Sequence, residues 1–192
     1  MNRKTAGLIT VILLLFMATA ISAAENSPPK VGSPMPTFEL PMLNNPVDLN
    51  YLGLPASGKS FKINQVKAKV VIIQIYSMYC PYCQAEAPNV NRLYAAIENS
   101  PTLKDKIKII GIGAGNTQFE VVTYKKKYSV TLPLLPDDDF KIHKIMGEVR
   151  TPYFITVKLS DGGKTEVIYS RLGALGDVDV FLAQLVTLSG LK

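Results

Sequence analysis

The chain has little cysteine, histidine or tryptophan. Its 192 residues include two cysteines, one histidine and no tryptophan. Scaffolds held together by disulfides use several cysteines to close long loops, and a structural zinc site needs about four ligands. Cys80 and Cys83 are only three positions apart, so neither use explains them well. His143 has no cysteine or acidic triad partner nearby, which argues against a cysteine–histidine hydrolase.

Charged residues are also sparse and scattered. They make up 19% of the chain, hydrophobic residues 47%, and the formal net charge is +6. This composition predicts one compact folded domain rather than disorder. The single basic cluster, Lys125-Lys126-Lys127, is typical of a solvated helix face. We therefore expect no nucleic acid among the partners.

The first 24 residues have the layout of an export signal. Arg3 and Lys4 precede an uncharged, mostly apolar stretch that ends in Ser22-Ala23-Ala24. This predicts a signal peptide at 1–24. The alternative is an uncleaved anchor, since about 20 apolar residues can span a bilayer. Both interpretations place the protein in the periplasm or otherwise outside the cytoplasm. The prolines at 25–36 indicate a linker before a domain at 37–192.

Two uninterrupted apolar runs predict buried strands at Val70–Tyr76 and Ile107–Ile112. A helix follows the first run as far as Glu98, and Asp177 begins a last amphipathic helix. A hairpin is expected at 153–172, and short strands at Val47–Tyr51 and Ser60–Ile63 suggest an N-terminal β-hairpin extension. The order predicts an α/β fold with a central mixed, mostly parallel sheet and helices on both faces.

Two glycine-containing segments resemble nucleotide-binding motifs but lack the required context. Residues 53–60 match a phosphate-binding loop, yet an alternating, strand-like segment follows instead of a helix. Residues 111–116 follow a strand but lack the third glycine and the later acidic residue of a dinucleotide site. Both are interpreted as turns.

The cysteine pair lies between the first buried strand and the helix that follows it. A thiolate at a helix N-terminus faces unpaired N–H groups and the positive end of the helix dipole. This lowers the pKa of Cys80 below that of a free thiol, about 8.5. Cys83 lies one turn further on, on the same side of the helix and within bonding reach. The pattern predicts a redox centre in which Cys80 attacks and Cys83 resolves the mixed disulfide.

A wider family resemblance extends this prediction. The segment YSMYCPYCQAEAP at 76–88 resembles the active site of TlpA/ResA-type thioredoxin-like thiol–disulfide oxidoreductases, and the resemblance covers residues 31–190. It implies a thioredoxin-like fold and a redox disulfide between Cys80 and Cys83. The resemblance also implies that Glu86 assists proton transfer and that Pro152 is a cis-proline that faces the disulfide. We expect no metal or other cofactor, because the chain offers too few ligands. The expected substrate-binding residues are Tyr79, Pro81, Tyr82, Thr151 and Pro152.

The segment departs from the family pattern in three places. Tyr79 replaces the usual tryptophan, and the dipeptide Pro81-Tyr82 is typical of glutaredoxins. Gln74 replaces the buried aspartate that thioredoxin carries six residues before its first cysteine. These departures leave the redox potential and the proton path open.

The sequence thus predicts an extracytoplasmic thiol–disulfide oxidoreductase that acts on protein substrates. The resemblance implies a reductase role in cytochrome c maturation, with apocytochrome c as substrate, and re-reduction by a membrane electron donor of the DsbD/CcdA type. The direction of electron flow stays open. One alternative is a thiol peroxidase of the peroxiredoxin type, with Ser77 where peroxiredoxins carry threonine. Another is a metallochaperone that binds copper through the cysteine pair and Met78.

Overall fold

The structure is a computed structural model that describes residues 27–191. The expected signal peptide at 1–24 lies outside these residues. Within the described range, no helix combines the length and the apolar character needed to cross a membrane.

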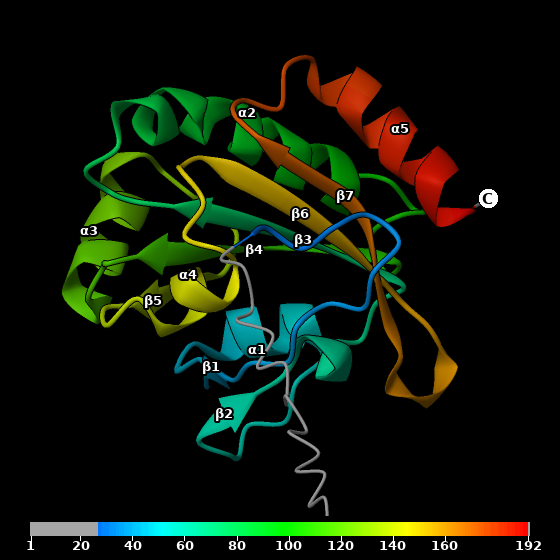
Figure 1. The fold of residues 1–192 in the computed structure, drawn as a ribbon, viewed down its shortest axis with the longest axis horizontal. Coiled ribbons are helices and arrows are strands. Elements are labelled where there is room, and N and C mark those ends of the chain that lie inside the picture. The colour runs from blue at the N-terminus through cyan, green and yellow to red at the C-terminus, as the bar shows by residue number, and fades with distance from the viewer. Residues whose placement is uncertain (1–26, 192) are drawn as a thin grey trace, which may run out of the picture.

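A five-stranded mixed sheet forms the centre of the described part of the chain, in the order β5-β4-β3-β6-β7 (Figure 1). The first half is parallel and consists of β3 (Val70–Tyr76), β4 (Ile107–Ala114) and β5 (Leu134–Asp137). The other half, β6 (Tyr153–Leu159) and β7 (Thr165–Leu172), is antiparallel. This is the mixed sheet expected from the sequence, with the apolar run at β3 in its middle.

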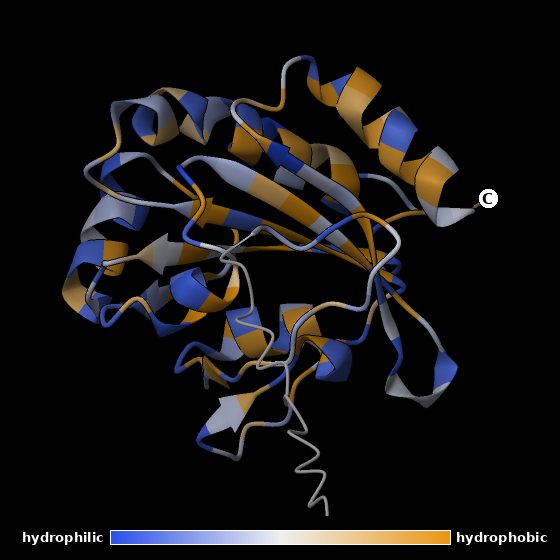
Figure 2. Ribbon diagram, viewed as in Figure 1, coloured by the Kyte–Doolittle hydropathy of each residue, from blue (hydrophilic) through white to orange (hydrophobic). Residues whose placement is uncertain are grey.

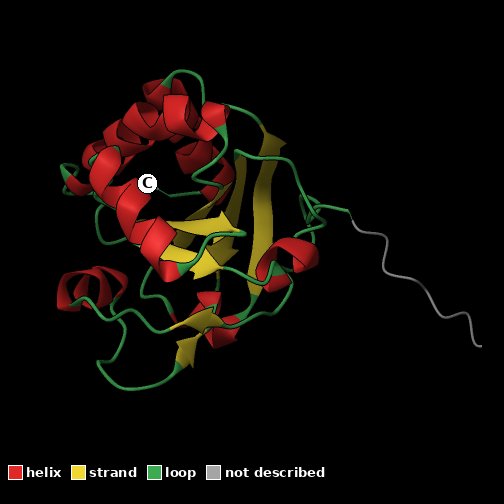
Figure 3. Ribbon diagram, turned by 90° about the vertical axis from the view of Figure 1, so that its left-hand side faces the viewer, coloured by secondary structure: helices red, strands yellow, loops and turns green. Residues whose placement is uncertain are grey.

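Helices cover both faces of the sheet (Figure 3). Helices α2 (Pro81–Glu98), α3 (Gln118–Lys127) and α5 (Val178–Ser189) pack on one face. Helices α1 (Pro46–Leu52) and α4 (Lys141–Ile145) pack on the other. Because successive strand residues point to opposite faces, Ile72 and Ile73 of β3 enter different cores.

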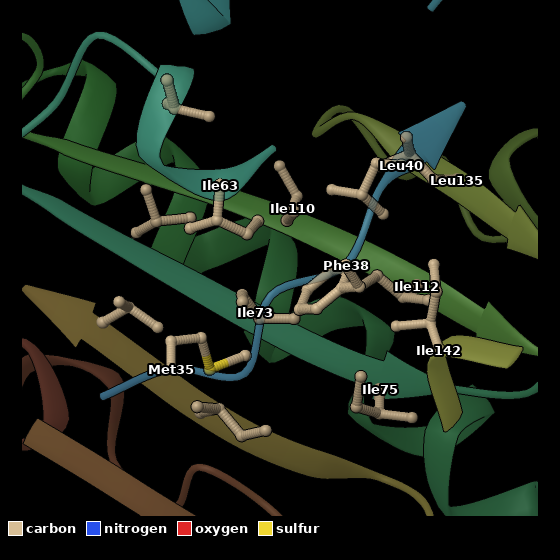
Figure 4. Close-up of a cluster of buried hydrophobic side chains, with 14 of the residues drawn as sticks. Met35, Phe38, Leu40, Ile63, Ile73, Ile75, Ile110, Ile112, Leu135 and Ile142 are labelled. Atoms are coloured by element: carbon tan, nitrogen blue, oxygen red, sulfur yellow. The ribbon is translucent and has the colours of Figure 1, made fainter. Parts of the chain in front are cut away.

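Hydrophobic residues therefore gather on the strands and on the helix sides that face them (Figure 2). Figure 4 shows the core on the α1 and α4 side, where Phe38 and Leu40 from the N-terminal region pack against Ile73 and Ile110 of the sheet. The N-terminal region is thus part of this core.

The N-terminal hairpin is present, but one of its expected strands is a helix. β1 (Leu40–Pro41) pairs with β2 (Ser60–Phe61), and a short 3-10 helix (Ile63–Gln65) follows. The expectation of a strand at Val47–Tyr51 was wrong, because these residues belong to α1. The Asn45 side chain accepts a hydrogen bond from the Val47 N–H at 2.9 Å, and Pro46 starts the helix. Both features favour a helix start.

Residues 27–36, expected as a linker, lie against the domain. The Gly32 N–H donates to the Val167 carbonyl oxygen at 2.8 Å, and the Val167 N–H donates to that of Ser33 at 2.9 Å. The side chain of Met35 is buried. This segment therefore covers part of the outer edge of β7. A second 3-10 helix (Asp161–Gly163) forms the turn between β6 and β7.

The glycines at 111–115 have structural roles. Gly111 and Gly113 lie inside β4, paired with β3. A side chain at Gly111 would collide with Leu134, and one at Gly113 would contact Asn116. Close packing of the strand against its neighbours explains both residues.

Candidate active site

Cys80 lies at the junction of β3 and α2. It is the N-cap of α2, with φ −82° and ψ 115°, and Pro81 begins the helix. Proline is favoured at this position because it has no N–H to leave unpaired and its φ already suits a helix. The thiol of Cys80 is therefore held at the positive end of an 18-residue helix.

The loop before Cys80 is fixed by side chains from two other segments. Asn116, which is fully buried, accepts a hydrogen bond from the Met78 N–H at 2.8 Å. Gln84 donates to the Met78 carbonyl oxygen at 2.8 Å. The phenol of Tyr79 donates to Glu120 of α3. Neither Asn116 nor Glu120 was among the expected site residues, because the spacing of Thr117 and Glu120 predicts only a helix cap.

Glu120 also belongs to the cap of its own helix. Its other carboxylate oxygen accepts hydrogen bonds from the Thr117 N–H at 2.7 Å and the Thr117 hydroxyl at 2.9 Å. The hydrogen bond from Tyr79 contributes most to lowering the pKa of Glu120 and to raising that of Tyr79. The start of α3 thus holds the residue that precedes Cys80.

Cys80 is partly exposed and close to the loop before β6. Its sulfur lies 3.3 Å from the carbonyl oxygen of Thr151. Partial burial alone would raise the pKa of Cys80, but hydrogen bonds that favour the thiolate outweigh it. They come from Thr151, the Cys83 N–H and thiol, and the Tyr82 N–H, and the net pKa is lowered.

Cys83 is fully buried, and both cysteines are free thiols in this structure. Burial raises the pKa of Cys83 to about 12, and the neighbouring Cys80 also raises it. Tyr124 of α3 donates a buried hydrogen bond to the Cys83 carbonyl oxygen at 2.8 Å. The two sulfurs therefore differ in both access and acidity, as the order of attack predicted from the sequence requires.

The Thr151–Pro152 peptide bond is cis. The carbonyl of Thr151 faces Cys80, so this loop lies directly against the first cysteine of the pair. The structure thus brings together Cys80, Cys83, Thr151 and Pro152, which lie up to 72 positions apart in the sequence.

Glu86 is buried, at 4% exposure, one turn beyond Cys83 on α2. One carboxylate oxygen accepts a hydrogen bond from the Leu175 N–H at 2.9 Å, and Asn89 lies 3.4 Å from the other. Glu86 also lines the groove beside Pro152.

Gln74 is buried on the face of β3 that packs against α2. Within residues 27–191, its side-chain nitrogen and the hydroxyl of Thr156 have no hydrogen-bond partner. A neutral amide thus takes the place of the aspartate that thioredoxin carries here.

Two grooves lie beside the cysteine pair. The proline groove, about 400 Å³, is lined by Tyr82, Ala85, Glu86, Arg150, Thr151, Pro152, Leu172, Gly173 and Ala174. The Phe140 groove, about 500 Å³, is lined by Ser77, Tyr79, Ala114, Gly115, Phe140, His143, Glu148, Val149, Arg150 and Thr151. Tyr79 and Tyr82, two of the predicted substrate-binding residues, are 65% and 77% exposed. A substrate that reaches Cys80 would meet both aromatic rings.

A mixed sheet with a cysteine pair at the N-terminus of a helix and a facing cis-proline defines the thioredoxin-like thiol–disulfide oxidoreductases. The chain belongs to the AhpC/TSA family, whose model matches residues 31–167. Within it, the resemblance to TlpA/ResA-type proteins is confirmed by the relatives described next.

Several relatives carry the description "Thiol-disulfide oxidoreductase ResA", among them the following two. The protein of Oceanobacillus iheyensis is 23% identical over 155 residues, covering 80% of this chain and 73% of the relative. That of Bacillus cereus is 26% identical over 148 residues, covering 73% and 75%. The protein is accordingly an oxidoreductase that exchanges thiols and disulfides.

Solved structures share the fold. StoA from Bacillus subtilis matches with a TM-score of 0.55 at 18% identity, covering 81% of this chain and 97% of StoA. A thiol:disulfide interchange protein from a Bacteroides species gives 0.59 at 18% identity, covering 85% and 93%. A secreted Mycobacterium tuberculosis disulfide oxidoreductase gives 0.52 at 18% identity, covering 81% and 96%.

Proposed function

We propose that this protein works outside the cytoplasm as a reductase of protein disulfides, with Cys80 as the attacking residue and Cys83 as the resolving residue. The observation that carries the proposal is the contrast between the two thiols. Cys80 is partly exposed with a lowered pKa, whereas Cys83 is fully buried with a pKa of about 12. The thiolate is the nucleophile in disulfide exchange, so Cys80 attacks first.

The reaction transfers two electrons in two steps. The Cys80 thiolate attacks one sulfur of the substrate disulfide, which breaks, and the other substrate sulfur leaves as a thiolate that takes up a proton. Cys83 then loses its proton and attacks the sulfur of Cys80. This step releases the second substrate thiol and leaves a disulfide between Cys80 and Cys83.

The high pKa of Cys83 means that its proton must be removed for the second step. Glu86 is the acid–base group of this proposal, because it follows Cys83 by one turn of α2 and lines the proline groove. Pro152 and the Thr151 backbone hold the substrate chain opposite Cys80, which is supported by the contact between the Thr151 carbonyl and the Cys80 sulfur.

The test compares two matched serine variants in the reduction of insulin disulfides. Cys80→Ser removes the attacking sulfur and should abolish both reduction and mixed-disulfide formation. Cys83→Ser retains the attack but loses resolution, so it should accumulate mixed disulfides that a reductant releases. Equal activity of wild type and both variants would refute the mechanism.

The cellular role proposed is reduction of apocytochrome c, with a membrane donor of the DsbD/CcdA type restoring the dithiol. The export layout of residues 1–24 and the secreted Mycobacterium relative support the location. Cell fractionation tests the location, and loss of c-type cytochromes in a deletion strain tests the substrate. Recovery of the protein in the cytoplasm would refute the location.

Two assays separate the alternatives drawn from the sequence. A thiol peroxidase would consume peroxide with Cys80 intact and Cys83 replaced. A copper carrier would bind one equivalent of Cu(I) and lose exchange activity on loading. We expect insulin reduction without either property.

A further inference from the structure

Arg150 occupies a central place beside Cys80. It lines both the proline groove and the Phe140 groove, as does its neighbour Thr151. The carbonyl of Thr151 lies 3.3 Å from the Cys80 sulfur. Consecutive Cα atoms are about 3.8 Å apart, so the backbone of Arg150 lies one residue before the carbonyl that contacts the Cys80 sulfur.

The acidic groups of the two grooves are already engaged. Glu86 is buried, and its carboxylate accepts a hydrogen bond from the Leu175 N–H. Glu148 also has an interaction partner. The ring nitrogen Nε2 of His143 is bonded to the Val149 carbonyl oxygen at 2.8 Å. Among these groove residues, Arg150 is therefore the exposed charged side chain that has no hydrogen-bond or ion-pair partner within residues 27–191.

Arg150 differs from several other cationic residues of the surface. Lys69, Lys125 and Lys141 each pair with an aspartate. The exposed guanidinium of Arg150 has no hydrogen bond, ion pair or ring contact within residues 27–191. A guanidinium presents a planar set of donors that matches a carboxylate with two parallel hydrogen bonds.

We propose that Arg150 is a specificity-determining residue that binds a carboxylate side chain next to the reacting cysteine of a protein substrate. The inference rests on the proposed attack by Cys80. An aspartate or glutamate beside the substrate cysteine would meet Arg150 while the substrate sulfur meets Cys80. A lysine in the same place would be repelled, which slows the encounter.

The experiment uses reduced full-length protein and three synthetic peptides. Each peptide carries one cysteine as a mixed disulfide with thionitrobenzoate, and both neighbours of the cysteine are glutamate, glutamine or lysine. Release of thionitrobenzoate gives the second-order rate constant by absorbance. Arg150→Gln removes the charge and Arg150→Glu reverses it. Lys144→Gln is the matched control, because Lys144 is an exposed cation of α4 that lines neither groove.

At low ionic strength, wild type should react about threefold faster with the glutamate peptide than with the glutamine peptide, and about tenfold faster than with the lysine peptide. In about 0.5 M salt, both rate ratios should approach one. Arg150→Gln should abolish the preference and Arg150→Glu should reverse it, whereas Lys144→Gln should retain it.

The outcomes separate this inference from the function on which it rests. Equal ratios in wild type and Arg150→Gln, or an equal loss of preference in Lys144→Gln, would overturn the assignment to Arg150 while leaving Cys80 as the nucleophile. Absence of release from all three peptides would overturn the proposed function itself.

Discussion

Replacing Gly115 with alanine tests how the fold shapes the Phe140 groove. Gly115 has φ +65°, and an added Cβ would collide with the ring of Phe140. An alanine in this left-handed region costs about 1 kcal/mol. Phe140 is 44% exposed and its ring can turn away, which adds about 0.5–1.5 kcal/mol for a side chain off its preferred rotamer. The free energy of unfolding should therefore fall by about 1.5–2.5 kcal/mol, measured by urea denaturation under reducing conditions.

Gly162→Ala is the matched control for the backbone cost. Gly162 has φ +78°, but no atom lies within 4 Å of the place that an added Cβ would take, so only the cost of the left-handed conformation, about 1 kcal/mol, applies. The steric effect is the difference between the two variants. Equal losses of stability would refute the argument that Phe140 fills the space beside Gly115. The same displacement should change exchange rates only in Gly115→Ala, since Gly115 and Phe140 line the groove.

Three further predictions follow from the site and the core. Tyr79→Phe removes the hydrogen bond to Glu120 and should change the rate of Cys80 alkylation while the melting temperature stays constant. An unchanged rate would show that this contact does not position the loop before Cys80. Alkylation of the reduced protein should reach half of its maximal rate below about pH 8.5, the pKa of a free thiol, because the pKa of Cys80 is lowered and the thiolate is present at lower pH; a midpoint at or above that of free cysteine would contradict the lowered pKa. Leu93→Ala, in the core beside α2, should lower the free energy of unfolding by about 2–5 kcal/mol. Leu188 is 44% exposed, so Leu188→Ala should cost well under half of that in the same urea titration. Similar losses in the two variants would contradict the burial of Leu93.

The centre of the fold could be predicted because its signals are local. The uninterrupted apolar run at β3 predicts a strand in the interior of a sheet, and the cysteine pair follows this strand directly. Once β3 ends at Tyr76 and α2 begins at Pro81, Cys80 must lie at the helix N-terminus. The Thr151–Pro152 cis bond was different, because the family resemblance, and not the local sequence, predicted it.

Helix α1 was missed although its signals were present. Asn44-Asn45-Pro46 reads as a turn, but Asn45 and Pro46 are also a good helix start. Leu49 and Leu52 are both buried at helical spacing, and the left-handed Gly53 ends the helix. The alternation of apolar residues over a short segment fits a strand and a helix alike, so packing against the sheet decides between them.

The contacts that tune the site could not be read from the sequence, because they join distant segments. Glu120 lies 41 positions from Tyr79, and the capping box with Thr117 explains Glu120 without any reference to the redox loop. The position of Arg150 between the two grooves can be recognised only once both grooves and the partners of the neighbouring acidic residues are known. Each depends on long-range packing, which no local pattern encodes.

Burial and acidity together decide which of the two sulfurs can react with a protein substrate. Cys83 is fully buried, so a disulfide carried on another folded protein cannot reach it, whatever its protonation state. A pKa of about 12 adds a second barrier, since almost no thiolate forms near neutral pH. In the proposed mechanism the sulfur that Cys83 attacks is therefore that of Cys80, because the two cysteines are one helical turn apart at the start of α2. The mixed disulfide makes the Cys80 sulfur the electrophile and the substrate sulfur the leaving group, so resolution stays intramolecular.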